Sequence, residues 1–218
     1  MNINSKDIEA ITRYWDEYSS YFDGEHNMEN INLWSKGLMT LLREGDEDVK
    51  KVLDIGTGTG FLALILAENG YDVKGIDISR EMMEIGMRKA SDRGLHIDFI
   101  YSLCEEMPFY DNEFDAVVNS RVLWTLTDPV NALKEWKRVV RPGGRIISFM
   151  RVMDTDGSSY YKKEEGEVFL PLSNAKREDY VKTYIDAGLI NVEVIEMPKE
   201  MSDSDMPHWT AFIGEVPT

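Results

Sequence analysis

The feature that most constrains the fold is an apolar run that stops at a cluster of glycines and then continues as an apolar helical pattern. Residues 51–67 read Lys-Val-Leu-Asp-Ile-Gly-Thr-Gly-Thr-Gly-Phe-Leu-Ala-Leu-Ile-Leu-Ala. The pattern predicts a buried strand, a tight turn and a helix, and Gly56, Gly58 and Gly60 let the backbone approach a ligand where a Cβ would clash. Free N–H groups at the start of the helix favour a polar or anionic ligand. The spacing argues against a dinucleotide fingerprint, which would need its third glycine at position 61, where this chain has Phe61.

Composition narrows the class of protein. The chain has 218 residues, of which 43% are hydrophobic, enough for one α/β domain with a full core. Its formal net charge of -16 argues against nucleic-acid binding, which depends on Lys and Arg, and slightly favours a neutral or cationic substrate. The single cysteine, Cys104, excludes an intrachain disulfide and a cysteine-rich zinc site. The first residues do not resemble a signal peptide and no apolar run could span a bilayer, so we expect a cytoplasmic protein without membrane contact.

Alternating strand and helix patterns predict a Rossmann-like α/β fold with a seven-stranded, mostly parallel sheet and helices on both faces. The predicted strands of the alternating part are Val52–Ile55, Asp72–Asp77, Ile97–Ile100, Phe114–Asn119 and Arg145–Met150. The predicted helices between them are Gly60–Asn69, Arg80–Arg93 and Pro129–Val140. A helix over Lys176–Ala187 precedes two β-rich runs, Val192–Met197 and His208–Val216, which predict an antiparallel C-terminal strand.

The chain is predicted to be a single domain, 1–218, with four parts. Residues 1–45 carry an apolar helical stripe through Ile8, Ile11, Trp15, Tyr18 and Phe22 and are predicted to form a helical cap over the carboxyl edge of the sheet. The cofactor-binding core is expected at 46–150, a lid loop at 151–175, and a helix and β-hairpin at 176–218.

Ligands of open α/β sheets bind beyond the carboxyl ends of the strands. Asp54 precedes the glycine turn, and Asp77 ends the second predicted strand. An acid at the latter position can accept hydrogen bonds from both hydroxyls of a ribose. The alternative role for Asp77 is capping of the following helix, although Ser79 is better placed for that.

Four segments in order carry a resemblance to a known family. They are VLDIGTGTG (52–60), VKGIDIS (73–79), MPFYDNEFDAVV (107–118) and RVVRPGGRIIS (138–148). Their sequence and spacing resemble the class I S-adenosylmethionine-dependent methyltransferases. The stretch 121–129 further resembles a small-molecule, methyltransferase type 11-like subgroup. The resemblance covers nearly half of the chain.

The resemblance implies S-adenosyl-L-methionine as the cofactor and S-adenosyl-L-homocysteine as its product. It implies that Asp54 and the backbone of residues 56–58 surround the methionine end of the cofactor. It also implies that Asp77 holds the ribose and that Ile78 packs on the adenine. Asn119 is implied to lie along the cofactor. The full set of implied cofactor-binding residues is Asp54, Gly56, Thr57, Gly58, Gly60, Asp77, Ile78, Cys104, Glu105 and Asn119.

Two positions depart from the family pattern. At the position of Leu103 the family usually has Asp, whose carboxylate accepts a hydrogen bond from the adenine amino group. In this chain Glu105, or backbone groups and water, would have to accept that bond. The lost bond is worth about 0.5–1.5 kcal/mol. Related proteins often have His at the position of Val122.

The predicted cap supplies candidates for the acceptor side. Tyr14, Tyr18 and Phe22 share a helical face and, with Trp124, are predicted to contact substrate or form a lid; core packing is the alternative. His26 is the candidate general base, needed only if the acceptor must lose a proton. No metal is expected, because the ligand types in residues 23–26 are crowded into one short stretch.

The leading hypothesis is methyl transfer to a small-molecule acceptor by in-line displacement in a monomer or homodimer. A non-catalytic S-adenosylmethionine-binding protein of the same fold and, less favoured, a nicotinamide-dependent oxidoreductase remain the alternatives. The acceptor and its reacting atom carry no readable signature.

Overall fold

The computed structural model describes residues 4–25, 29–44, 48–152, 162–163, 166–201 and 208–218. Seven strands form one sheet in the order β3-β2-β1-β4-β5-β9-β8. The first five of these in that order run parallel, and β9 runs antiparallel to both β5 and β8. The strands of this sheet are β1 (Lys51–Ile55), β2 (Asp72–Asp77), β3 (Asp98–Tyr101), β4 (Phe114–Ser120), β5 (Val140–Arg151), β8 (Ile190–Glu196) and β9 (Trp209–Glu215).

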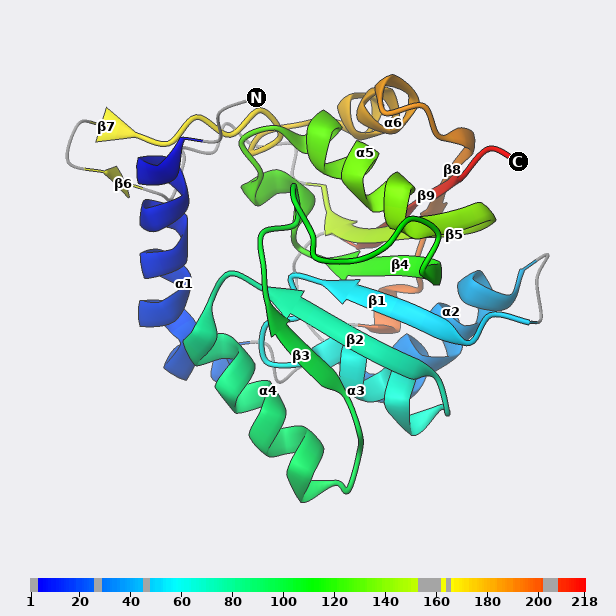
Figure 1. Ribbon diagram of the computed structural model, residues 1–218, viewed down its shortest axis with the longest axis horizontal. Coiled ribbons are helices and arrows are strands. Elements are labelled where there is room, and N and C mark those ends of the chain that lie inside the picture. Colours follow the sequence, from blue (N-terminus) through cyan, green and yellow to red (C-terminus); the bar gives the residue numbers. More distant parts are fainter. Residues whose placement is uncertain (1–3, 26–28, 45–47, 153–161, 164–165, 202–207) are drawn as a thin grey trace.

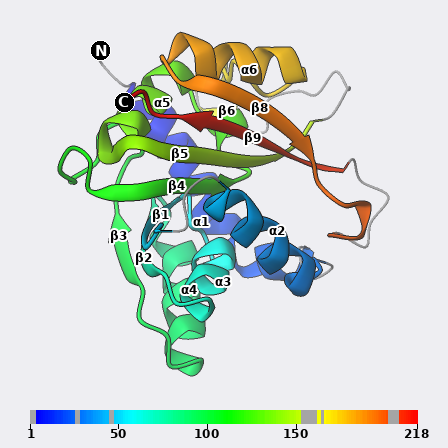
Figure 2. The ribbon, with the colours of Figure 1, turned by 90° about the vertical axis from the view of Figure 1, so that its right-hand side faces the viewer.

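Helices cover both faces of the sheet, as predicted (Figures 1 and 2). In the view of Figure 1, α5 and α6 lie above the sheet, whereas α2, α3 and α4 lie below it. The helices are α1 (Ser5–Glu25), α2 (Ile31–Arg43), α3 (Phe61–Glu68), α4 (Arg80–Asp92), α5 (Pro129–Val139) and α6 (Arg177–Asp186). Two short 3-10 turns, η1 (Leu123–Thr125) and η2 (Lys199–Met201), and a small hairpin of β6 (Lys162–Lys163) and β7 (Gly166–Glu167) complete the described elements.

Local sequence explains where the helices begin. Gly60 adopts φ +85 directly before α3, a conformation that favours glycine. The Ser79 side chain accepts a hydrogen bond from the Met82 N–H and caps α4. Asp128 caps α5, and Pro129 occupies its first turn, where a missing N–H costs nothing.

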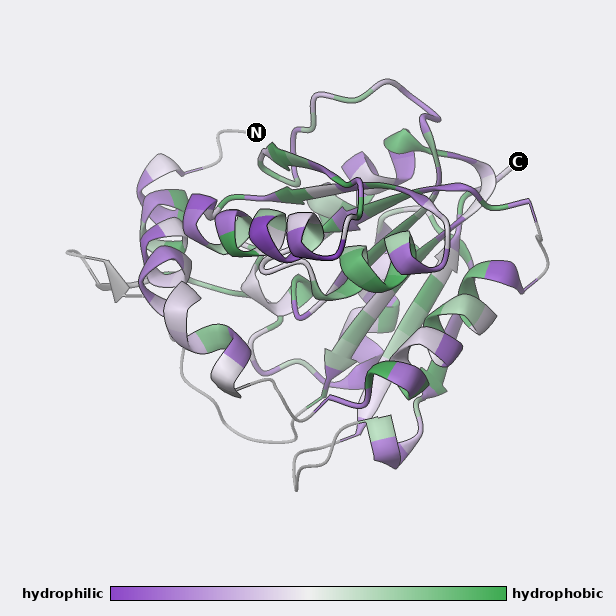
Figure 3. Cartoon of the chain, turned by 90° about the horizontal axis from the view of Figure 1, so that it is seen from below, coloured by the Kyte–Doolittle hydropathy of each residue, from purple (hydrophilic) through white to green (hydrophobic). Residues whose placement is uncertain are grey.

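Each face of the sheet has its own apolar core, because successive strand residues point to opposite sides. On the side of α5 and α6 the core includes Trp136, Tyr184 and Phe212. On the side of α2 and α3 the Trp34 ring packs edge-on against Trp209, with ring centroids 5.1 Å apart. Figure 3 shows mostly hydrophobic strands and helices that alternate between hydrophobic and hydrophilic residues.

The helix α1 stands apart from both layers. It lies across the carboxyl ends of the parallel strands, to the left of the arrowheads of β1 and β2 in Figure 1. It packs on α4 and β6. The described part therefore has the N-terminal helical cap that the sequence predicted.

Most predicted element bounds differ from the observed ones by one or two residues. The exception is β5, which starts at Val140 instead of Arg145 and includes the Pro142-Gly143-Gly144 corner, where Gly143 has φ +74. A register shift between Phe114 and Ala116 accommodates this start. The lid role of 151–175 stays a prediction, since 153–161 and 164–165 lie outside the described residues.

Candidate functional site

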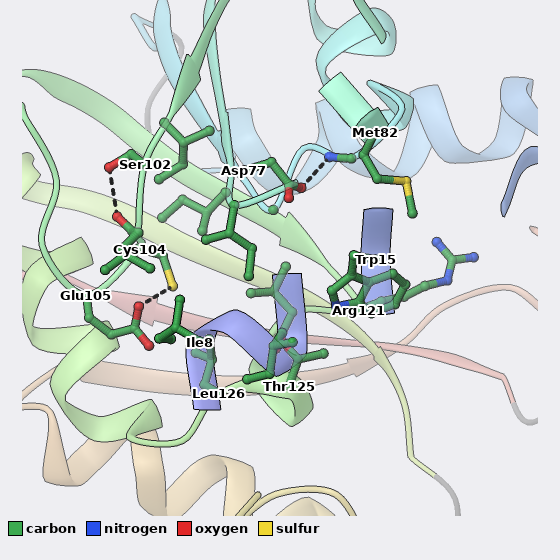
Figure 4. A pocket seen from close by; sticks show the side chains of 18 of the residues that line it. Ile8, Trp15, Asp77, Met82, Ser102, Cys104, Glu105, Arg121, Thr125 and Leu126 are labelled. Atoms are coloured by element: carbon green, nitrogen blue, oxygen red, sulfur yellow. Dashed lines mark hydrogen bonds between the residues drawn. The ribbon is translucent and has the colours of Figure 1, made fainter. Parts of the chain in front are cut away.

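A pocket opens between α1 and the carboxyl ends of β1, β2 and β4, and it encloses about 800 Å³ of empty space, part of it open to solvent. Its sheet wall, as we name it, consists of Gly56, Gly58 and Asp77, and its helix wall consists of Ile8, Ile11, Trp15 and Phe22 of α1. Figure 4 shows the side chains that line it.

The turn between β1 and α3 forms the centre of the sheet wall. Gly56 and Gly58 have φ values of +61 and +53. A Cβ on Gly56 would lie 2.3 Å from Val122 Cγ2, so glycine is needed there for packing. A Cβ on Gly58 would meet no protein atom nearer than 3.9 Å. Since Gly58 lines the pocket, the space next to it is open to the pocket.

Asp77 ends β2 and lies in the pocket wall beside this turn. Its carboxylate accepts hydrogen bonds from the N–H groups of Gly58 and Ser79, each at 2.8 Å. Burial raises the pKa of Asp77 to about 6, although these backbone N–H groups favour the ionised form. A carboxylate with two oxygens retains acceptor capacity for further donors, such as hydroxyls of a ligand.

The loop after β3 closes one end of the pocket. Leu103, Cys104 and Glu105 all line it. The Cys104 Sγ lies 3.3 Å from a Glu105 carboxylate oxygen, and the Trp136 indole donates to the Cys104 carbonyl at 3.0 Å. Burial raises the pKa of both Cys104 and Glu105. The thiol is thus a neutral packing group, and Glu105 is the acid nearest to the position where the family usually has Asp.

The helix wall differs in phase from the predicted aromatic face. Trp15 and Phe22 line the pocket, whereas Tyr14, Tyr18 and Trp124 pack around Trp15 with ring centroids 5.2–6.5 Å away. Among the predicted lid residues only Phe22 thus belongs to the wall. Trp15 was visible in the apolar stripe but was not predicted as a site residue.

Side chains tie α1 to the sheet wall. The Ser79 hydroxyl donates to Asp16 at 2.6 Å, directly behind the Asp77 carboxylate. The Thr59 hydroxyl donates to Asp23 at 2.7 Å, and Lys89 forms an ion pair with Asp23 at 2.6 Å. The cap is therefore anchored to the glycine turn and to α4.

Some predicted cofactor-binding residues support the site from behind. Asp54 is buried and accepts from the Thr57 hydroxyl at 2.8 Å and the Ala63 N–H at 3.1 Å. Burial raises the pKa of Asp54 to about 7. Gly60 directly precedes α3, as described above, whereas Ile78 lines the pocket; its contact with an adenine stays a prediction. A direct role of Asp54, Thr57 and Gly60 in ligand contact stays a prediction.

Asn119 is fully buried and lies outside the pocket wall. Its amide donates to the Ser148 hydroxyl at 2.7 Å, and the Tyr184 hydroxyl lies 2.6 Å from the same oxygen. The two residues that follow it, Ser120 and Arg121, line the pocket instead. Its placement along the cofactor stays a prediction.

Arg121, which the sequence did not single out, forms the far end of the pocket. It is the first residue after β4, has φ +65, and its Nη2 lies 2.8 Å from a Glu29 carboxylate oxygen. Its guanidinium carbon lies 4.4 Å from the centroid of the Trp209 ring. Burial lowers the pKa of Arg121 to about 10, so it is a cation at neutral pH.

Three further expectations concern groups outside this geometry. The candidate base His26 lies outside the described residues. Within the described ranges, no group of three or more His, Cys, Asp or Glu residues is arranged to hold a metal ion. None of the helices in that part of the chain is long and apolar enough to cross a membrane.

Comparisons with known sequences show what the chain is similar to. Residues 53–148 match the model of a family described as "Methyltransferase domain". The chain is 42% identical over 100 residues to a demethylmenaquinone methyltransferase of Thermus thermophilus, covering 45% of this chain and 46% of that protein. It is 28% identical to the corresponding Staphylococcus aureus protein over 88% of this chain and 89% of that one.

Solved structures agree on the fold. A SAM-dependent methyltransferase from Aquifex aeolicus superposes with a TM-score of 0.67 at 19% identity, covering 92% of this chain and 98% of that chain.

The chain spans about half of the length of the first curated relatives that it matches. The matched shares of their lengths are 46%, 58% and 40%.

Proposed function

Because the chain belongs to the class I S-adenosylmethionine-dependent methyltransferases, we propose that it transfers the methyl group of S-adenosylmethionine to a small-molecule acceptor bound in the same pocket. The observation that carries this proposal is the pairing of Gly58 and Asp77 on one wall. Gly58 leaves open the space that a side chain would occupy, and Asp77 presents a carboxylate to that space. Both features suit a ribose with two free hydroxyls.

The side chains that line the pocket have suitable chemistry for such a cofactor. Ile78 and Cys104 offer apolar contact to an adenine, and Glu105 offers an acceptor for its amino group. Glu105 would thus take the place of the acid missing at Leu103. The methionine end would lie against Gly56, toward the end of β4.

The bound cofactor would supply an electrophilic methyl group, which leaves sulfur as the acceptor forms its new bond. The contribution of the chain is to orient the two partners in line and to exclude water. Trp15 and Phe22 close the pocket above the sheet wall, and their ring faces attract a sulfonium cation. No base is required where the acceptor already carries an ionised or unprotonated nucleophile.

Curated relatives direct the choice of acceptors to test. They are named demethylmenaquinone methyltransferases, so a demethylated quinol belongs in an acceptor panel together with phenols, carboxylates and amines. The alternative function is cofactor binding without catalysis.

Calorimetry with S-adenosylhomocysteine, S-adenosylmethionine and NAD tests the cofactor. We expect both adenosyl ligands to bind and NAD not to bind; tight binding of NAD alone would contradict the proposal. Transfer of a labelled methyl group across the panel tests catalysis. Binding without turnover on every acceptor would favour the non-catalytic alternative.

A further inference from the structure

Arg121 lines one end of the pocket, and its guanidinium is held in a fixed orientation. Glu29, whose side chain is 4% exposed, bonds its Nη2, and the Trp209 ring stacks against its planar face. The other Glu29 oxygen accepts from the indole N–H groups of Trp34 and Trp209 at 2.7 and 3.2 Å. Arg121 is therefore preorganised by a buried carboxylate that is itself fixed by two tryptophans.

This orientation leaves Arg121 with capacity for a ligand. Its bonds to described side chains, from Nη2 to Glu29 and from Nη1 to the Ser120 hydroxyl at 3.3 Å, use two of the five N–H donors of a guanidinium. The residue lines the pocket, and its side chain is 18% exposed. Its backbone is held in a left-handed conformation that costs an L-residue about 1–2 kcal/mol, so the surrounding structure keeps it there against strain.

The strand order indicates which ligand would reach it. Asp77 ends β2 and Gly56 follows β1, whereas Arg121 follows β4 and lies over the ring of Trp209 in β9. Arg151 at the end of β5 lies behind it, over the same ring at 4.6 Å and 3.3 Å from the same Glu29 oxygen. A cofactor held by β1 and β2 ends near β4, so a ligand that extends farther in this direction is the acceptor.

The walls next to Arg121 constrain the shape of that acceptor. Trp15 and Phe22 line the same pocket as Arg121, and Figure 4 shows Trp15 and Arg121 among its labelled residues. Flat aromatic walls favour a planar ligand through ring stacking. A guanidinium favours an oxyanion, which it can bind through two parallel N–H bonds.

Resting on the function proposed above, we propose that Arg121 binds an oxyanion of a planar aromatic acceptor, a carboxylate or an ionised hydroxyl. The local cation thus reverses the expectation from the net charge of -16, which slightly favoured a neutral or cationic substrate. Long-range charge guides approach to the surface, but the contact group in a desolvated pocket decides what binds.

Two probes of matched shape test the charge: 1-naphthoate, an anion at pH 7.5, and neutral 1-naphthamide. Calorimetry measures their affinity for the parent, Arg121→Met, Arg121→Lys and Arg93→Met, each saturated with S-adenosylhomocysteine. Arg93 is the matched control, since it pairs with Glu68 at 2.8 Å on the outer surface near the end of α4.

We expect the parent to prefer naphthoate by about tenfold or more, the value of one charge-assisted hydrogen bond. Arg121→Met should abolish this preference, Arg121→Lys should retain part of it, and Arg93→Met should leave it unchanged. Thermal unfolding of each variant checks folding, and Arg121→Lys keeps the test decisive if Arg121→Met unfolds. The affinity for S-adenosylhomocysteine should change less than about threefold, below the value of one hydrogen bond.

Three results would overturn the proposal. They are equal affinity of the parent for both probes, an intact preference in Arg121→Met, and a loss of S-adenosylhomocysteine affinity in that variant with the probe preference kept. The last result would assign Arg121 to the carboxylate of the cofactor. If the parent binds no S-adenosylhomocysteine at all, the proposed function fails, and the probe comparison on the ligand-free protein still tests the anion site separately.

Discussion

The sheet wall and the helix wall face one ligand space but are held in place by different forces. Gly56 and Gly58 follow β1, and Asp77 ends β2; the backbone groups of these two strands pair with each other. The helix wall is held by apolar packing and by side-chain contacts of Asp16 and Asp23. The first wall is part of the paired sheet, whereas the loss of the contacts that hold the second would leave the sheet paired. We therefore expect mutations in the sheet wall to change mainly the affinity for a ligand, and mutations in the helix wall to change mainly the rate at which the ligand dissociates.

The largest effect is expected from Asp77→Ala. Two hydroxyl bonds to a carboxylate are lost, each worth about 1.5–3 kcal/mol, so S-adenosylhomocysteine affinity should fall by about 100-fold or more. Calorimetry measures the change, and Asp72→Ala, at the exposed start of the same strand, is the control. An affinity equal to that of the parent would remove Asp77 from the ribose site.

Glycine substitutions in the turn should distinguish packing from ligand contact. Gly56→Ala drives a Cβ into Val122 and should lower the free energy of unfolding by about 2–4 kcal/mol. Gly58→Ala should cost about 1–2 kcal/mol of stability but weaken S-adenosylhomocysteine binding by about 10- to 100-fold, because its Cβ enters the ligand space. Denaturant unfolding and calorimetry measure the two effects; binding unchanged in Gly58→Ala would show that this space is not used.

Acid should weaken ligand binding at the sheet wall. Since the pKa of Asp77 is raised to about 6, its carboxylate protonates below that pH and loses acceptor strength. The affinity for S-adenosylhomocysteine should be constant above pH 7 and fall by up to about tenfold per unit below pH 6. Titration calorimetry at pH 7.5, 6.5 and 5.5 checks this, and a flat profile would contradict it.

The same burial has the opposite effect on ligand-free stability. The pKa values of Asp77 and Asp54 rise to about 6 and about 7, above the value near 3.9 of an unfolded chain. The folded state then binds more protons than the unfolded state between pH 4 and 7, so the free energy of unfolding should decrease as pH rises through this window. Asp54→Asn should flatten that slope in denaturant melts.

The smallest effect is expected on the helix wall. Asp23→Ala removes the Lys89 ion pair and the Thr59 bond, together about 1 kcal/mol at a partly exposed site. The dissociation rate of S-adenosylhomocysteine should rise about three- to tenfold in stopped-flow experiments, with a smaller change in the melting temperature. Asp186→Ala, which loses an ion pair to Lys182 on α6, is the control. An unchanged dissociation rate would mean that α1 does not gate the pocket.

The difference between the walls also explains what the sequence could predict. The strand order and the glycine turn follow from local patterns, since apolar runs and turn residues fix the strands and their ends. Ile78 and Glu105 reach the pocket because each follows a strand of the parallel sheet. On α1 the predicted apolar stripe includes the pocket-lining residue Trp15, whereas the predicted lid residues Tyr14 and Tyr18 pack beside its ring.

Other features depend on contacts between distant segments and leave no local pattern. Arg121 owes its position to Glu29, 92 residues away in sequence, and to Trp209. Asn119 points away from the pocket because successive side chains of β4 alternate between faces, and its neighbour Ser120 takes the pocket side. The internal bonds of Asp54 likewise involve other segments, because one of its carboxylate oxygens accepts from both the Thr57 hydroxyl and the Ala63 N–H in α3.

The β3 strand, four residues long at the edge of the sheet, pairs only with β2 in the described residues. The connection from β3 to β4, residues 102–113, contains no helix in the structure. Backbone amide hydrogens of such an edge strand exchange with solvent through small local unfolding events. Those of the central strands β1 and β4 exchange only through larger unfolding events. Cys104 and Glu105 lie in the loop that follows this strand. A ligand at that end of the pocket should therefore slow amide exchange in β3 more than in any other strand of the sheet.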